Sequence, residues 1–103
     1  MAKKIINGKL YNTETATLVA EWCNNYSTTD FNYCDESLYR KRTGEYFISG
    51  AGGPLTQYSR SCGNNSWGYG SEITPLTKKE AKQWAEDKMS ADGYIAEFGE
   101  VEE

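Results

Sequence analysis

A capping box near residue 77 divides the chain into two parts of different character. In Thr77-Lys-Lys-Glu80, the threonine hydroxyl can accept a hydrogen bond from the Glu80 amide, while the glutamate side chain reaches back to the Thr77 amide. Ala81, Trp84 and Ala85 then recur at helical spacing. The sequence therefore predicts a helical part over residues 77–99, preceded by a strand-rich part over residues 1–76 and followed by an acidic tail, residues 100–103.

A second, shorter helix is predicted to restart at Ser90, which can serve as its N-cap. Tyr94, Ile95 and Phe98 share one face of this helix, and Gly99 provides its stop. The residues expected to seal the core from the helical side are Trp84, Ile95 and Phe98.

Tight turns punctuate the strand-rich part. Asn7-Gly8 between two strand-like segments predicts a β-hairpin over residues 3–12. Thr43-Gly44 predicts a second hairpin, formed by residues 37–43 and 45–49. Residues 13–25 alternate between polar and apolar side chains, which favours a strand, although a short helix also fits their spacing. Residues 24–35 are rich in Asn, Ser, Thr and Asp and are predicted to form a loop.

The segment Gly50-Ala-Gly-Gly-Pro54 is predicted to interrupt the strand pattern. Residues 55–61 and 72–76 are predicted as further short strands, separated by a surface loop over residues 62–71. Because 103 residues suffice for one core, the expected architecture is a single α+β domain. It consists of a small antiparallel sheet of four to five strands, covered on one face by one or two C-terminal helices.

The composition of the chain argues against several classes of function. The chain contains no histidine, so the commonest general base and the usual serine or cysteine triads are missing. Its three cysteines, Cys23, Cys34 and Cys62, form no CxxC pair, which argues against zinc and predicts mostly buried free thiols, with a disulfide left open. No apolar run is long enough for a membrane span and no secretory signal is apparent, so a cytoplasmic protein is expected.

Neither the glycine-rich segment nor the acidic residues mark a catalytic or cofactor site. Gly50-Ala-Gly-Gly lacks the Lys-Ser/Thr ending of a phosphate-binding loop, and Pro54 stands where a helix would begin. The acidic residues around the central hairpin show no metal-binding pattern and are expected to be solvated. We therefore predict no catalytic residue, no metal and no cofactor, with a metal-dependent ribonuclease as the residual enzymatic alternative.

The densest basic cluster is Tyr39-Arg-Lys-Arg42, on the central hairpin. With nearby aromatic and basic residues it could form a surface that holds RNA or a phosphate backbone. The alternative is an ordinary edge strand protected by charge. The candidate binding residues are Tyr39, Arg40, Lys41, Arg42, Tyr46, Tyr58, Arg60 and Trp67.

Acidic residues are concentrated at the other end of the chain. The whole chain carries a net charge of −4, whereas residues 86–103 alone carry −6, which leaves +2 for the rest. These carboxylates either keep the chain soluble or imitate phosphates and occupy a basic nucleic-acid channel. The residues of this alternative acidic surface are Glu97, Glu100, Glu102 and Glu103.

Four segments carry a resemblance to known proteins. They are Lys4-Ile-Ile-Asn-Gly-Lys-Leu-Tyr-Asn-Thr-Glu-Thr-Ala16, Leu38-Tyr-Arg-Lys-Arg-Thr-Gly-Glu-Tyr-Phe47, Ile73-Thr-Pro-Leu-Thr-Lys-Lys-Glu-Ala-Lys-Gln-Trp84 and Phe98-Gly-Glu-Val-Glu-Glu103. Together they resemble small proteins carried by phages, plasmids and integrative elements of Firmicutes. Some members of that group act as type II anti-CRISPR inhibitors of Cas9.

The resemblance implies a binding inhibitor whose partner is Cas9, the Cas9–guide RNA complex or the guide RNA. Such an inhibitor would interfere with guide loading, with target-DNA engagement or with a nuclease domain. Promotion of guide-RNA truncation is an activity of some relatives in that group that we do not transfer to a chain without histidine or a clear acid cluster. The alternatives are a small protein that binds or cleaves RNA, and an accessory protein of a mobile element that binds a restriction enzyme or a transcription factor.

Overall fold

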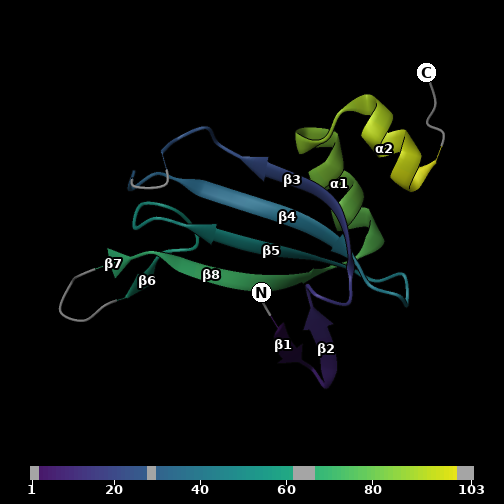
Figure 1. Cartoon of the computed structure of the whole chain (residues 1–103), viewed down its shortest axis with the longest axis horizontal. Coiled ribbons are helices and arrows are strands. Elements are labelled where there is room, and N and C mark those ends of the chain that lie inside the picture. Colours follow the sequence, from purple (N-terminus) through teal and green to yellow (C-terminus); the bar gives the residue numbers. More distant parts are fainter. Residues whose placement is uncertain (1–2, 28–29, 62–66, 100–103) are drawn as a thin grey trace.

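The computed structural model describes residues 3–27, 30–61 and 67–99. A four-stranded antiparallel sheet forms its centre, two helices lie together beside it, and a separate hairpin lies on the other side (Figure 1). This arrangement confirms the predicted small α+β fold. The elements in chain order are β1 (Lys3–Ile6), β2 (Lys9–Asn12), β3 (Thr17–Cys23), β4 (Cys34–Arg40), β5 (Tyr46–Gly52), β6 (Arg60–Ser61), β7 (Trp67–Gly68), β8 (Gly70–Leu76), α1 (Lys78–Lys88) and α2 (Ala91–Phe98).

The central sheet has the strand order β3-β4-β5-β8, and every neighbouring pair is antiparallel. β4 lies inside this sheet, so the alternative that residues 39–42 belong to a charged edge strand is wrong. The two edges are β3 and β8. β3 carries a register irregularity between Leu18 and Ala20, and β8 contains Pro75 opposite Phe47.

The predicted N-terminal hairpin is confirmed. β1 and β2 pair through the register Ile6↔Lys9, with Asn7 and Gly8 between them. Both turn residues have positive φ, 52° for Asn7 and 78° for Gly8, which a type I′ turn requires and which asparagine and glycine tolerate best. The strand favoured over residues 13–25 is also confirmed, because β3 occupies Thr17–Cys23 within that range.

Alternation along β4 and β5 gives the sheet two apolar faces. On one face, Leu38 and Ile48 form a buried cluster with Ala81 of α1. On the opposite face, Phe47 forms a second cluster with Tyr11 of the hairpin. The helices and the hairpin therefore cover opposite faces of the same sheet.

Both predicted helices begin at the predicted caps. Thr77 and Glu80 form the complete capping box, with a hydrogen bond of 3.1 Å from the Glu80 amide to the Thr77 hydroxyl. Ser90 caps α2 by accepting a hydrogen bond from the Gly93 amide. The described helices include none of sufficient length and apolar character to span a bilayer.

Trp84 and Phe98 contact the core as predicted, whereas the prediction for Ile95 is wrong. Ile95 is 42% exposed. The face of α2 that meets the sheet is set by Phe98 and by Glu97, which hydrogen-bonds to β4 and β5. Ile95 is left on the side of α2 that borders α1.

Residues 50–61 depart from the predictions. β5 continues through Gly50 to Gly52, so the predicted break begins only at Gly53. The glycines are required here by close approach, since a Cβ at Gly50 would overlap the ring of Tyr58. Most of the predicted strand over residues 55–61 is instead a pair of turns, closed by the hydrogen bonds Thr56 N to Gly53 O and Ser59 N to Thr56 O.

Part of the predicted loop over residues 62–71 lies outside the described residues, namely 62–66. The described remainder is partly strand, because Trp67 pairs with Ser61 and Gly70 pairs with Gly52. The glycines suggested a flexible loop, but the neighbouring strand β5 supplies the backbone partners that extend β8 to Gly70.

Gly50→Ala is expected to destabilise the protein by about 2 kcal/mol, because the added methyl group must displace the buried Tyr58 ring. Urea unfolding followed by tryptophan fluorescence measures this change. Ser71→Ala, at an exposed position of β8, is the matched variant and should unfold like the wild type within about 0.5 kcal/mol. Equal stability of the two variants would contradict the packing described here.

Candidate functional site

The two surfaces that the sequence offers as alternatives meet in one internal contact. Arg40, at the end of β4, donates from Nη1 to both carboxylate oxygens of Glu97 on α2, at 2.6 and 2.5 Å. The hydroxyl of Tyr46 donates to the same carboxylate at 2.6 Å. The Glu97 side chain is only 12% exposed. A basic residue and an acidic residue predicted to contact different partners thus bind each other and fasten α2 to the sheet.

This contact changes the predicted roles of three residues. Glu97 is not displayed as the phosphate-imitating hypothesis requires, and Glu100, Glu102 and Glu103 lie outside the described residues. Tyr46 is buried, and burial together with the hydrogen bond to Glu97 raises its pKa to about 12. Its ring is therefore unavailable for stacking on a base at the surface.

Tyr58 is also internal. It is 7% exposed, and its hydroxyl donates to Glu36, a carboxylate that is itself 5% exposed. Burial is the largest cause that raises the pKa of Tyr58, and this hydrogen bond is the second.

Tyr39 is half-buried and stacks on Phe47 with ring centroids 5.3 Å apart. The candidate residue Arg60 pairs through its backbone with Gly68, and the candidate residue Trp67 pairs with Ser61. The side chains of Arg60 and Trp67 lie outside the described part.

Glu36 is the centre of a buried hydrogen-bond network between the sheet and α1. One carboxylate oxygen accepts from Trp84 Nε1 at 3.0 Å and from Lys88 Nζ at 2.5 Å, and the other accepts from Gln57 at 3.1 Å and from Tyr58. Burial raises the pKa of Glu36, but the donated hydrogen bonds, first of all the one from Lys88, lower it by more than burial raises it. The net effect is a pKa below the usual value for a glutamate. The polar groups of these side chains are therefore used in contacts that join the sheet, α1 and the turn after β5.

The remaining basic residues of the predicted cluster line a cleft between the N-terminal hairpin and the β4–β5 turn. This cleft has a volume of about 460 Å³. Lys41 and Arg42 enter it from the turn, and Lys9 enters it from β2. The hydroxyl-bearing Thr15 and Thr43 also line it.

Glu45 partly neutralises the cleft. Its carboxylate accepts from Lys9 at 3.1 Å and pairs with Lys41 at 3.4 Å. The hydrogen bond from Lys9 is the largest effect that holds the pKa of Glu45 below its usual range. The Lys41 ammonium also lies 4.2 Å from the centroid of the Tyr11 ring, a cation–π contact that fixes its position.

Arg42 is the cation of the cleft that stays free. It is exposed, and no acidic side chain within the described ranges lies within ion-pair distance of it. With three cations and one carboxylate, the lining keeps an excess of positive charge. Such a site can hold an anion through Arg42 and Lys9, whereas the hydroxyls of Thr15 and Thr43 already donate to Asn12 O and to the Glu45 carboxylate.

Sequence reasoning identified Lys41 and Arg42 but missed Lys9, Asn12 and Thr15, which complete the cleft. The signal available was the presence of three lysines, Lys3, Lys4 and Lys9, in the N-terminal hairpin. What the sequence does not indicate is that this hairpin packs on the sheet through Tyr11 and Phe47, which brings Lys9 to Glu45.

No match to this chain was found among protein-family models, curated proteins or solved structures.

The cysteines differ from the prediction of mostly buried thiols. Cys23 is exposed at the end of β3, whereas Cys34 is half-buried and burial raises its pKa. Neither forms a disulfide. Cys62 lies outside the described residues. Within residues 3–27, 30–61 and 67–99, no three acidic or thiol side chains gather closely enough to hold a metal ion.

Proposed function

We propose that the chain is a binding protein that holds a nucleic-acid-containing partner at the cleft between the N-terminal hairpin and the β4–β5 turn. The observation that carries the proposal is Arg42, an exposed guanidinium that forms no ion pair with the described residues and lies beside Lys9 in a cleft with excess positive charge. A guanidinium with free donors is well suited to a phosphate group. The partner that the sequence resemblance suggests is the Cas9–guide RNA complex, and the action that it suggests is inhibition of Cas9 in the bacterial cytoplasm.

The basic route is favoured over acidic mimicry because of how the side chains are used. Mimicry of phosphates needs exposed carboxylates, and Glu97 is committed to Arg40 and Tyr46. The basic route needs a cation that is free in the unbound protein, which Arg42 provides. A catalytic role has less support, since the buried carboxylate Glu36 is surrounded by its own donors.

Arg42→Glu is expected to weaken binding to the Cas9–guide RNA complex by about tenfold or more, because it replaces a phosphate-binding cation with a repelling charge. Fluorescence anisotropy with labelled guide RNA, alone and bound to Cas9, measures this loss. Arg40 and Lys41 are unsuitable for the test, because both support the fold through Glu97, Glu45 and Tyr11.

Lys79→Glu is the matched control, since it reverses one exposed charge on α1 that does not line the cleft, and it should bind like the wild type. Wild-type binding by Arg42→Glu would refute the role of the cleft. Binding of guide RNA without Cas9 would favour the alternative of an RNA-binding protein. RNA cleavage in Mg²⁺ that stops in EDTA would replace the binding proposal with a nuclease.

A further inference from the structure

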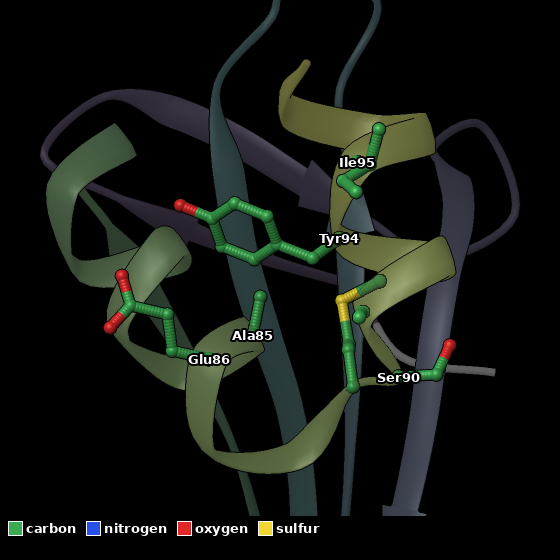
Figure 2. Close-up of a pocket in the computed structure, with 7 residues that line it drawn as sticks. Ala85, Glu86, Ser90, Tyr94 and Ile95 are labelled. Atoms are coloured by element: carbon green, nitrogen blue, oxygen red, sulfur yellow. The ribbon is translucent and has the colours of Figure 1, made fainter. Parts of the chain in front are cut away.

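A second groove lies between the two C-terminal helices, on the face of the sheet opposite the N-terminal hairpin. It has a volume of about 360 Å³ and a mainly apolar lining, which includes Met89, Ala91, Tyr94 and Ile95. Figure 2 shows the Tyr94 ring reaching from α2 toward α1, with Ile95 at the next position of α2 and Glu86 on α1. Ile95 is the side chain that sequence analysis assigned to the core, yet 42% of it remains exposed here.

One acidic residue lines this groove, and two others are next in sequence to lining residues. Glu86 lines the groove directly, Asp87 follows it on α1, and Asp92 follows Ala91 on α2. All three are exposed, and none has a basic side chain within ion-pair distance in the described part of the chain. Lys82 precedes Glu86 by one helical turn without pairing with it.

Between residues 86 and 99, the two remaining charged residues, Lys88 and Glu97, are already neutralised. Lys88 pairs with Glu36, and Glu97 pairs with Arg40. The free charges beside the groove are therefore predominantly negative. An apolar channel with a negative rim is complementary to a helix that has an apolar stripe flanked by lysine or arginine.

We propose that the groove between α1 and α2 binds a basic amphipathic helix of a partner protein. Apolar side chains at i, i+3, i+4 and i+7 of that helix would contact Met89, Tyr94 and Ile95, and its cationic side chains would lie beside Glu86 and Asp92. This inference does not depend on the anion-binding role of the cleft, because the groove is built from other residues on the opposite face of the sheet.

The test uses a synthetic peptide with leucines at i, i+3, i+4 and i+7 and lysines on the remaining face. Isothermal titration calorimetry with the full chain should detect binding of this peptide. A scrambled peptide of the same composition keeps the charge but loses the apolar stripe, and it should bind about tenfold more weakly. The same pattern with glutamate in place of lysine should not bind.

Ile95→Asp separates groove binding from general attraction between opposite charges. It removes an apolar contact while it adds a negative charge, so groove binding weakens by about tenfold, whereas general attraction would strengthen. Leu55→Asp is the matched control, because Leu55 is exposed, lies in a loop outside both helices and should leave the affinity unchanged. Both positions are exposed, and circular dichroism verifies that both variants fold.

Equal binding of the scrambled peptide, or unchanged affinity of Ile95→Asp, would overturn the proposal. It would also be overturned if sedimentation showed a dimer that Ile95→Asp dissociates, because the occupant of the groove would then be a second copy of the chain. Loss of RNA-complex binding in Arg42→Glu with intact peptide binding would separate this inference from the proposed function.

Discussion

Replacing Glu36 by alanine is expected to lower the free energy of unfolding by about 3–5 kcal/mol, the largest effect among the substitutions considered. The carboxylate accepts hydrogen bonds from Trp84, Lys88, Gln57 and Tyr58, which come from α1 and from the turn after β5. Its removal leaves the Lys88 ammonium without its counter-charge and the buried Tyr58 hydroxyl without its acceptor. Urea unfolding followed by tryptophan fluorescence measures the loss.

Glu72→Ala provides a matched control, because Glu72 lies in the same row of the sheet as Glu36, with Gly50 between them, but is exposed. It should change stability by less than about 0.5 kcal/mol. The double variant Glu36→Leu with Lys88→Met should recover part of the loss, since no uncompensated charge then stays behind. If Glu36→Ala were as stable as Glu72→Ala, the hydrogen-bond network around Glu36 would contribute nothing to the free energy of unfolding.

The Glu36 contribution also depends on pH. Because the pKa of Glu36 is lower in the folded protein than its ordinary value of 4.5, folding favours the ionised form. The stabilisation is fully present above that ordinary value and is lost as the pH falls through the folded-state pKa. The stability difference between wild type and Glu36→Gln should therefore shrink on acidification below 4.5, and a constant difference would contradict this account.

Glu97→Ala is expected to cost about 2–3 kcal/mol, because it leaves the Arg40 guanidinium and the Tyr46 hydroxyl without their shared acceptor. The loss should be concentrated in α2, whose residues are all at least partly exposed. Hydrogen exchange should therefore show faster exchange in residues 91–98 than in α1.

Glu86→Ala is the control for this substitution, because Glu86 is an exposed glutamate on α1 and has no ion pair among the described residues. Its stability should match the wild type within about 0.5 kcal/mol. Tyr46→Phe removes one of the donors to Glu97 and should cost about 1 kcal/mol. If α2 exchanged at the wild-type rate in Glu97→Ala, the helix would be held by Phe98 packing alone.

The elements that were predicted correctly are those whose determinants are local. The capping box of Thr77 and Glu80 spans four residues, and the Asn7-Gly8 turn is specified by two residues with positive φ. The glycines after Ile48 were misinterpreted for the opposite reason. They belong to a strand because their backbones pair with β4 and β8, and they are glycines because the Tyr58 ring and the Thr56 side chain lie against Gly50 and Gly52. Neither the pairing nor the contacts follow from local sequence preference.

The candidate site was predicted only in part, because pairing between distant residues decides which charges stay free. Arg40 and Glu97 are 57 residues apart, and their contact withdraws one member from each predicted surface. Tyr58 is likewise removed from the predicted binding surface, because its hydroxyl donates to the buried Glu36. Arg42 keeps the exposure that its sequence position suggested, since it lies in the turn beyond the end of β4 and pairs with none of the carboxylates that the structure describes.

The edges of the central sheet limit how this protein can associate with others. The irregular register of β3 near Val19 disturbs the row of backbone groups at one edge, and Pro75 removes one amide donor from β8 at the other. Both features oppose the strand-by-strand stacking that leads to fibrils. The protein should therefore resist aggregation at high concentration even though β3 and β8 form the two edges of its central sheet.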